Sequence, residues 1–380
     1  MRIAILTLPL DTNIGGILQC YALQTVLERM GHDVQVLAKP QYARSFYWIY
    51  PLSVGKRFLQ HLLLGKQVPI WKTPHEIVSQ HVHRFIQQRI HRRTRRCWSE
   101  DVIRGFDAIV VGSDQIWRPD YLWIYSLEDV FLQFTHSLHL RRIAYAASFG
   151  VDKCPFTPAQ LQKCIPLLKK FDAVSVRESS GVEICRNDFG VEACQMMDPT
   201  LLLQTEDYSR LVEQGDTKPS AGDLLVYLLD RNPDKEAIVN AVATTRNGHP
   251  FHVGSRVDDA AVPLKERIQI PVEQWLRGFK EAKMVVTDSF HGCVFSILFQ
   301  KPFVAIGNAS RGMARFTSLL QLFGLEDRLI GSLAEFQLRK EELLTPIDYV
   351  SVYARLRICR EKAMTFLNQN LDGSPLVMEN

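Results

Sequence analysis

Mostly apolar runs alternate with amphipathic stretches along most of the chain. Residues 2–8 form an apolar run with β-branched members, and residues 17–31 place apolar side chains at helical spacing and end on Gly31. The run predicts a buried strand, and the spacing predicts a helix that stops at the glycine. A further strand at 32–38 completes a strand–loop–helix–strand unit, which predicts a parallel sheet with a right-handed crossover.

The same alternation returns twice further along the chain, with helices between the strands. Strands are predicted at 107–113, 142–150 and 172–178, and then at 224–230, 251–255, 283–289 and 301–307. The predicted fold class is therefore α/β, with two doubly wound, Rossmann-like domains that face each other across a cleft. Ligands bind in such crevices, outside the carboxyl ends of the strands.

The domain limits follow from a polar segment between the two series. Residues 204–223 contain Gly, Pro and Ser and are predicted to be a linker, with the domain boundary near Asp198. We expect an N-terminal domain at 1–198, a C-terminal domain at 199–345 and a helical tail at 346–380. One alternative is that this tail packs back onto the N-terminal domain.

Residues 42–105 break the α/β rhythm and are predicted to form a helical insertion. Between Ile77 and Ser99 this segment holds six arginines and no acidic residue. A basic run of this kind is usually a solvated helix face. The alternative is a peripheral membrane contact, in which residues 84–96 attract anionic lipid headgroups.

Composition narrows the class of protein. A chain of 380 residues with 46% hydrophobic and 23% charged residues can bury the cores of two domains. The net charge of +4 and the absence of RNA-binding or zinc-finger signatures argue against a nucleic-acid partner. The apolar run at the N-terminus is too short for a signal peptide, and no run of 18 apolar residues predicts a membrane helix. We therefore expect a cytoplasmic protein, with the inner face of the membrane as an alternative.

The eight cysteines include no CxxC pair, which argues against a zinc site of cysteines. Their density is too low for a disulfide scaffold, so reduced and mostly buried thiols are expected. No cluster with metal-ligand spacing stands out in the sequence. We expect no obligatory metal and no cofactor.

Polar and glycine residues follow the predicted strands of the N-terminal domain. The loop with Asn13, Gly15 and Gly16 precedes a helix, where glycines and free N–H groups favour an anion or a sugar hydroxyl. The alternative is a tight turn that only needs glycine. Arg177 ends another strand and could clamp a phosphate or a carboxylate, unless it only pairs with Glu178 or another surface acid.

A second polar group follows the strand at 107–113. Ser113, Asp114, Gln115 and Trp117 combine a carboxylate, an amide and an indole. This combination suits sugar recognition through hydrogen bonds and ring stacking. The alternative is a helix cap that is followed by a packing tryptophan.

The C-terminal domain offers a histidine and two arginines at strand ends. His291 follows the strand at 283–289 in the first turn of a predicted helix, next to Gly292, where the helix dipole attracts anions. The alternative is a histidine that packs beside a helix cap. Arg311 and Arg315 lie four residues apart at the next strand end and could share a helical face with an anion pocket. The alternative there is two solvated arginines.

Seven motifs, in this order, resemble the polysaccharide pyruvyl transferase family over about residues 2–330. They are TNIGGILQCYALQ, VGSDQIW, YAASFG, SVRE, DPTLLL, TDSFHG with KPFVAIG, and ARFTSLLQLFGL. The resemblance implies a two-lobed fold similar to GT-B glycosyltransferases. It also implies transfer of a pyruvyl group from phosphoenolpyruvate to a sugar, usually as a ketal across two hydroxyls.

The resemblance also implies roles on the donor side. His291 matches the histidine that is linked to donor binding and catalysis, and Arg315 matches an arginine that is linked to the anionic groups of the donor. Many members have an arginine at the position of Ser289, so Arg311 or Arg177 is expected to replace that charge.

Our working hypothesis assigns the remaining positions to the two substrates. His291 acts as acid and base and Asp114 assists; Ser289, Gly292 and the three arginines hold phosphoenolpyruvate. The acceptor is expected to be a saccharide, either free or lipid-linked. Its expected contacts come from the N-terminal domain and are Asn13, Gly15, Gly16, Ser113, Gln115 and Trp117.

Two other functions fit the same fold. One is a GT-B glycosyltransferase that uses a nucleotide sugar, for which the sequence shows no clear glutamate near a ribose site. The other is a non-catalytic polysaccharide-assembly protein. Binding of a nucleotide instead of phosphoenolpyruvate would favour the first, and an inert His291→Ala variant with unchanged surface glycan would favour the second.

Overall fold

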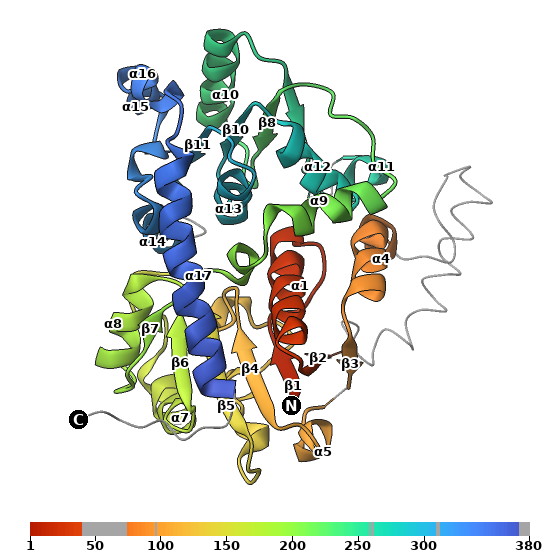
Figure 1. Cartoon of the computed structure of the whole chain (residues 1–380), viewed down its shortest axis with the longest axis vertical. Coiled ribbons are helices and arrows are strands. Elements are labelled where there is room, and N and C mark those ends of the chain that lie inside the picture. Colours follow the sequence, from red (N-terminus) through yellow and green to blue (C-terminus); the bar gives the residue numbers. More distant parts are fainter. Residues whose placement is uncertain (40–73, 96, 258, 260–261, 309–311, 372–380) are drawn as a thin grey trace, which may run out of the picture.

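The chain forms two lobes, each built around a parallel sheet (Figure 1). The computed structural model describes residues 1–39, 74–95, 97–257, 259, 262–308 and 312–371. This architecture confirms the predicted α/β class with two Rossmann-like domains.

Seven parallel strands form the sheet of the first lobe, in the order β3-β2-β1-β4-β5-β6-β7. Side chains of β1 alternate between its faces, because Ile3 and Ile5 join one apolar cluster and Ala4 and Leu6 join another. Both faces are therefore covered, as parallel sheets require. The strands are β1 (Arg2–Leu6), β2 (Asp33–Ala38), β3 (Arg92–Thr94), β4 (Ala108–Gly112), β5 (Arg141–Ala147), β6 (Ala173–Val176) and β7 (Cys194–Gln195).

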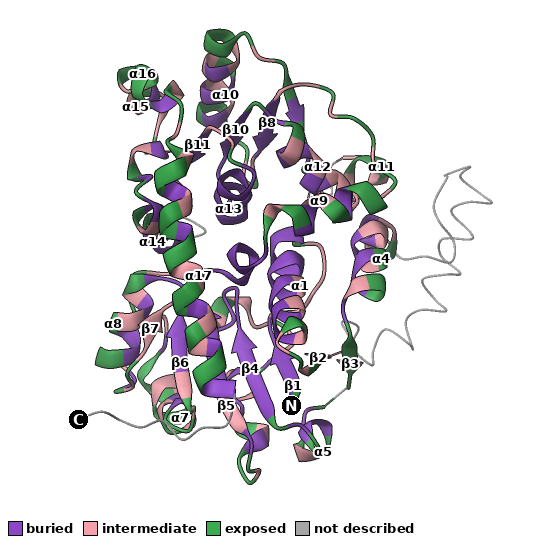
Figure 2. Cartoon of the chain, viewed as in Figure 1, coloured by how far each residue is buried: buried purple, intermediate pink, exposed green. Residues whose placement is uncertain are grey.

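Five parallel strands form the sheet of the second lobe, in the order β12-β11-β10-β8-β9. One face of this sheet shares an apolar cluster with the first lobe, so a continuous core links the two domains (Figure 2). The strands are β8 (Leu224–Tyr227), β9 (Pro250–His252), β10 (Met284–Thr287), β11 (Phe303–Ile306) and β12 (Leu329–Ile330).

Helices connect the strands and cover both sheets (Figure 1). The α-helices are α1 (Ile14–Arg29), α3 (Pro74–Val78), α4 (Gln80–Arg89), α5 (Glu100–Ile103), α6 (Leu127–Val130), α7 (Pro158–Leu168), α8 (Ser179–Asn187), α9 (Thr205–Gln214), α10 (Pro233–Arg246), α11 (Leu264–Arg267), α12 (Val272–Glu281), α13 (Phe290–Leu298), α14 (Ala314–Phe323), α15 (Leu333–Leu338), α16 (Lys340–Leu344) and α17 (Tyr349–Leu371). Short 3₁₀ helices are η1 (Pro119–Tyr121), η2 (Gln133–Thr135), η3 (Pro199–Leu202) and η5 (Glu326–Arg328).

Two segments differ from the prediction. The expected linker at 204–223 contains helix α9, because Tyr208, Leu211 and Val212 recur at helical spacing and are buried. The basic insertion is not entirely helical, since residues 92–94 form β3, the edge strand beside β2. The first part of the predicted insertion, up to residue 73, lies outside the described residues.

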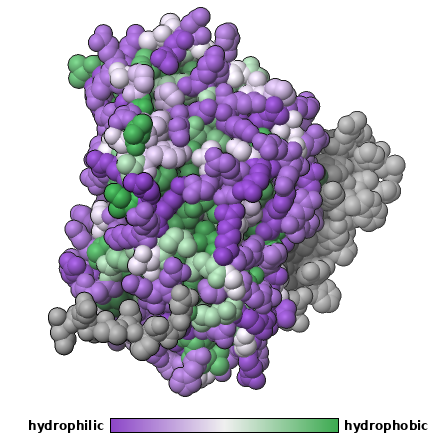
Figure 3. Space-filling model, viewed as in Figure 1, coloured by the Kyte–Doolittle hydropathy of each residue, from purple (hydrophilic) through white to green (hydrophobic). Residues whose placement is uncertain are grey.

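Hydrophilic side chains cover most of the face that Figure 3 draws. Among the described helices, none combines the length and the apolar character that a membrane crossing demands. Arg84, Arg92 and Arg95 of the basic segment 84–96 are exposed on α4, β3 and the residue that follows β3. Peripheral membrane association through this segment stays a prediction.

Helix α17 runs along both lobes (Figure 1). At its start the Tyr353 hydroxyl donates to the Leu298 carbonyl in the second lobe (2.6 Å). Near its end the Asn370 carbonyl accepts a hydrogen bond from Arg141 of β5 (2.9 Å). The last helix therefore ties the second lobe back to the first.

Replacement of a buried residue of α17 should weaken the fold. Leu367 is fully buried, so Leu367→Ala is expected to lower the free energy of unfolding by about 2–5 kcal/mol, because a cavity replaces packed methyl groups. Ile358 lies on the same helix but is 63% exposed, and Ile358→Ala should change stability by less than about 0.5 kcal/mol. Urea unfolding measures both, and equal effects would contradict the packing of α17.

Candidate active site

The candidate site lies where both sheets change their strand order. In the first lobe, β1 lies between β2 and β4, so the chain continues on one side of β1 and later on the other. In the second lobe, β8 lies between β9 and β10 in the same arrangement. Loops at such switch points open a crevice. The loop after β1 carries Asn13, the loop after β4 carries Asp114, and His291 follows β10.

A cleft of about 1110 Å³ occupies this position and is lined by both lobes. It brings together six of the residues that the sequence predicts for the site, which are Asn13, Asp114, Gln115, Ser289, His291 and Arg315.

His291 lies in the first turn of α13, with only 6% of the residue exposed. Ser289 caps this helix, and its hydroxyl oxygen accepts a hydrogen bond from the Gly292 N–H (3.4 Å). The imidazole packs against α1 of the other lobe, where a Cβ atom at Gly15 would lie 2.1 Å from His291 Nδ1. Glycine at position 15 is therefore needed for this close contact between the lobes.

Asp198 is a site residue that the sequence analysis did not propose. Its carboxylate lies at the start of η3, between the lobes, and Oδ2 is 3.1 Å from Arg177 Nη2 and 3.6 Å from His291 Nε2. Oδ1 accepts hydrogen bonds from the backbone N–H and the hydroxyl of Thr200 (2.9 and 2.6 Å). Burial would raise the pKa of Asp198, but Arg177, His291 and Thr200 together outweigh burial and lower it, so the carboxylate is charged.

Two buried arginines flank the ring of Phe290, next to His291. The guanidinium carbons of Arg177 and Arg315 lie 4.8 and 5.6 Å from the ring centroid. Arg177 also donates to the Ser113 hydroxyl. Burial, with the neighbouring charge of Arg177, lowers the pKa of Arg315 to about 10, so this guanidinium group remains cationic at neutral pH.

Asp114 and Asn13 form the opposite wall of the cleft. Asp114 adopts a positive φ of 60°, an uncommon conformation for a residue with a side chain. Its carboxylate accepts from the Gln115 N–H (2.9 Å) and from the Asn13 side chain (3.5 Å), while Asn13 also caps α1 by accepting from the Gly16 N–H. Both side chains line the cleft.

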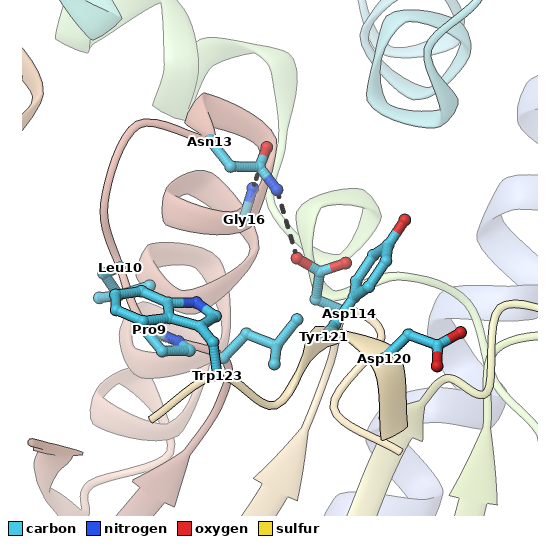
Figure 4. A pocket seen from close by; sticks show the side chains of 9 residues that line it. Pro9, Leu10, Asn13, Gly16, Asp114, Asp120, Tyr121 and Trp123 are labelled. Carbon is cyan, nitrogen blue, oxygen red and sulfur yellow. Dashed lines mark hydrogen bonds between the residues drawn. The ribbon is translucent and has the colours of Figure 1, made fainter. Parts of the chain in front are cut away.

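A second, smaller cavity of about 270 Å³ adjoins this wall (Figure 4). It is lined by Asn13, Gly16 and Asp114, together with Tyr121 and Trp123. Neither of these two aromatic residues was predicted from the sequence. Trp123 is 61% exposed. The only available signal was an aromatic-rich stretch after VGSDQIW, which no periodicity distinguishes from a core segment.

Several predicted contacts are placed elsewhere. Trp117 is fully buried and stacks on Phe131 at 5.4 Å, so its indole cannot stack on a sugar; the packing alternative is the one observed. Ser113 is also fully buried, beside Arg177 and Asp198, and not in the cleft. Gly292 serves helix–strand packing, because a Cβ there would meet the Thr287 side chain at 2.1 Å. Arg311 lies outside the described residues.

Other charged residues of the second lobe line the cleft but were not predicted. Arg231 contacts His252 Nδ1 at 2.7 Å, and both residues face the cleft from the loops after β8 and at β9. Asp288 has a structural role, since it accepts from the backbone of Leu229 (2.6 Å) and pairs with Lys235 (2.6 Å).

Loss of the Asp198 charge should destabilise the protein. Asp198→Asn keeps the volume but leaves Arg177 buried without its counter-charge, so the free energy of unfolding is expected to fall by about 3–5 kcal/mol. Asp101→Asn breaks the exposed pair with Arg104, whose side chains are 81% and 71% accessible, and should leave stability almost unchanged. Urea unfolding of both variants measures the difference, and a neutral Asp198→Asn would contradict the central role of this pair.

Several solved structures match this chain at low sequence identity. UDP-GlcNAc 2-epimerase from Neisseria meningitidis, bound to UDP-GlcNAc, matches with a TM-score of 0.50 and 9% identity, over 96% of this chain and 100% of that chain. UGT89C1 from Arabidopsis thaliana, complexed with UDP-L-rhamnose, matches with a TM-score of 0.48 and 10% identity, over 97% of both chains. MurG from Acinetobacter baumannii matches with a TM-score of 0.43 and 12% identity, over 98% and 99%. The epimerase supports the GT-B-like fold and does not bear on chemistry.

Sequence comparison identifies the family. No curated protein matches this chain. The family model "Polysaccharide pyruvyl transferase" matches residues 13–310, which include the loop at Asn13, the motif at Asp114 and the histidine of the cleft. The chain belongs to the polysaccharide pyruvyl transferase family, a family of transferases.

Proposed function

We propose that this chain moves a pyruvyl group from phosphoenolpyruvate to a sugar of a bacterial-type surface polysaccharide or its precursor, forming a ketal and releasing phosphate. The observation that carries the proposal is the meeting of His291 and Arg315 in one cleft, with Asp198 3.6 Å from the imidazole. An acid–base group beside a cation suits a donor that must be protonated and that carries two anionic groups.

The donor would bind on the wall of the second lobe. Its phosphate and carboxylate need cations, and Arg315 supplies one at the cleft surface. The N-terminus of α13 adds the positive end of its dipole, whereas Arg177 is paired with Asp198 behind the Phe290 ring. Together Arg315 and this helix N-terminus would replace the arginine that many family members have at the position of Ser289.

His291 would supply the proton that activates the donor. Asp198 Oδ2 lies 3.6 Å from Nε2, so this charge orients the imidazole from which the proton would pass to the methylene carbon of phosphoenolpyruvate. C2 then becomes electrophilic, one sugar hydroxyl adds, phosphate leaves and a second hydroxyl closes the ketal. Of the two hydroxyl protons, one replaces the proton that His291 gave, and the other leaves with phosphate.

The acceptor would bind on the wall of the first lobe. The Asp114 carboxylate and the Asn13 amide can take hydrogen bonds from sugar hydroxyls, and Asp114 can receive the proton of the attacking hydroxyl. The adjoining cavity of about 270 Å³ has Tyr121 and Trp123 on its wall, and aromatic faces of this kind stack on sugar rings (Figure 4). We assign to Trp123 the stacking role that the sequence analysis gave to Trp117.

Transfer from a nucleotide sugar is the second candidate, and one observation favours it. Glu266 of the second lobe lines the cleft, and a GT-B glycosyltransferase typically has a glutamate near the ribose of its donor. The cleft is also larger than phosphoenolpyruvate alone needs. A test of the proposed function therefore includes both donors.

Phosphate release separates the candidates. Purified protein is supplied with phosphoenolpyruvate and a panel of pyranose glycans, free and lipid-linked, and phosphate is measured over time. We expect release that depends on a glycan, and a rate that His291→Gln lowers by about 10²–10⁴-fold because the general acid is lost. His81→Gln, a change outside the cleft, is the matched control and should keep the wild-type rate.

Two outcomes would decide against pyruvyl transfer. The first is the absence of phosphate release with every glycan, together with calorimetric binding of a nucleotide and none of phosphoenolpyruvate, which would support the second candidate. The second is a His291→Gln variant with the wild-type rate, which would remove the proposed acid.

Trp123 provides a separate test of the acceptor wall. Loss of ring stacking in Trp123→Ala should raise the KM for the glycan about 2- to 10-fold, with the KM for phosphoenolpyruvate unchanged. Trp123→Phe keeps an aromatic face and should retain most of the affinity. Leu338→Ala, at another exposed apolar residue, is the control. An unchanged glycan KM in Trp123→Ala would show that the sugar binds elsewhere.

A further inference from the structure

Three potential metal ligands meet beside the cleft, and one of them lies more than 60 residues before the other two in the sequence. Asp11 belongs to the loop between β1 and α1, His75 to α3 and His83 to α4. Asp11 Oδ1 lies 2.9 Å from His75 Nε2 and 3.5 Å from His83 Nε2, and all three ligand atoms are within 4.8 Å of one another. We call Asp11, His75 and His83 the triad.

The spacing of the triad fits a tetrahedral divalent ion. Zinc binds imidazole nitrogen and carboxylate oxygen at about 2.0–2.2 Å, so neighbouring ligand atoms lie roughly 3.3 Å apart. The two measured distances to Asp11 Oδ1 fall on either side of that value. Two histidines and one carboxylate leave one position for water.

The hydrogen-bond geometry of Asp11 also suggests an ion. Its Oδ1 atom is buried, yet among the described residues it accepts no hydrogen bond of acceptable geometry, in spite of two nearby imidazole nitrogens. Each imidazole forms bonds through Nε2 only along one direction in its ring plane. In this structure, that direction does not pass through Asp11 Oδ1. A metal ion bound to both nitrogens and to the oxygen would lie off each N···O line and would satisfy the Asp11 oxygen.

Ser79 fixes the tautomer of His83 that a metal requires. The Ser79 hydroxyl donates its hydrogen to the His75 carbonyl (2.7 Å), so it can only accept from His83 Nδ1 at 3.2 Å. His83 then carries its hydrogen on Nδ1, and the lone pair of Nε2 faces the Asp11 carboxylate. Two facing acceptors repel unless a cation lies between them, and a hydrogen-bonded Nδ1 is the usual arrangement behind a metal-binding Nε2.

Asp11 supplies the carboxylate of the triad, with one oxygen close to both imidazole nitrogens. A deprotonated carboxylate with two imidazoles is a ligand set that suits zinc and related transition metals.

We propose that Asp11, His75 and His83 bind one divalent transition-metal ion, with Zn²⁺ as the best match, and that the ion fastens helices α3 and α4 to the loop before α1. The second lobe contacts the same two segments, since Gln269 bonds to the carbonyls of Val78 (2.8 Å) and Thr12 (2.9 Å). The ion would thus fix the loop that presents Asn13 to the cleft. This proposal does not depend on the proposed transfer reaction.

Metal titration of the full chain tests the proposal directly. Protein without a histidine tag is stripped with a chelator and titrated with Co²⁺, followed by visible absorption, and with Zn²⁺, followed by calorimetry. We expect one ion per chain, the d–d bands of a four-coordinate cobalt site and no thiolate charge-transfer band. His83→Ala and Asp11→Asn should each weaken binding at least tenfold, and Ser79→Ala should weaken it about 10–100-fold through His83.

His81→Ala provides the matched control, because His81 lies on the same helix but outside the triad. It should bind Zn²⁺ like the wild type, and Zn²⁺ should raise the Tm of both proteins but not of His83→Ala. The proposal is overturned by the absence of a stoichiometric ion, which would leave a protonated histidine–aspartate pair. Equal Zn²⁺ affinity in the wild type and in a correctly folded His83→Ala would also overturn it, since the ion would then lie elsewhere.

Discussion

The buried carboxylate of Asp198 is the constraint around which the site is arranged. It lies where the chain passes from one lobe to the other, and it contacts Arg177 of the first lobe and His291 of the second. A charge of this kind is tolerated only with its partners in place, because its desolvation is costly. The position of one lobe relative to the other, the orientation of the imidazole and the placement of Arg177 are therefore linked through one side chain.

Much of the fold could be predicted from the sequence. Many parallel strands are buried on both faces and appear as short apolar runs, and nine predicted runs matched the strands β1, β2, β4, β5, β6, β8, β9, β10 and β11. The strands that were not predicted, β3, β7 and β12, have two or three residues each and lie at sheet edges, where pairing and not an apolar pattern defines them. Helix α9 was missed because its apolar residues are diluted by charged ones.

The site was only partly predictable, for a similar reason. Residues that directly follow a strand, such as Asp114 and His291, could be placed because parallel strands end at one edge. Asp198 follows no predicted strand. Trp117 is buried in the core and Trp123 is exposed, and no local sequence pattern distinguishes these two environments. The triad depends on contacts between segments more than 60 residues apart, so its proximity could not be read from spacing.

Helix α17 has a consequence for motion between the lobes. The chain crosses from the first lobe to the second at η3 and returns along α17, so two separate connections join the same two bodies. Arg360 of α17 donates to the carbonyls of Leu201 and Leu203 at η3, so the two connections are packed together. If the lobes open to admit a substrate, Gly15 and His291 would separate, whereas the packed crossing of η3 and α17 would move least.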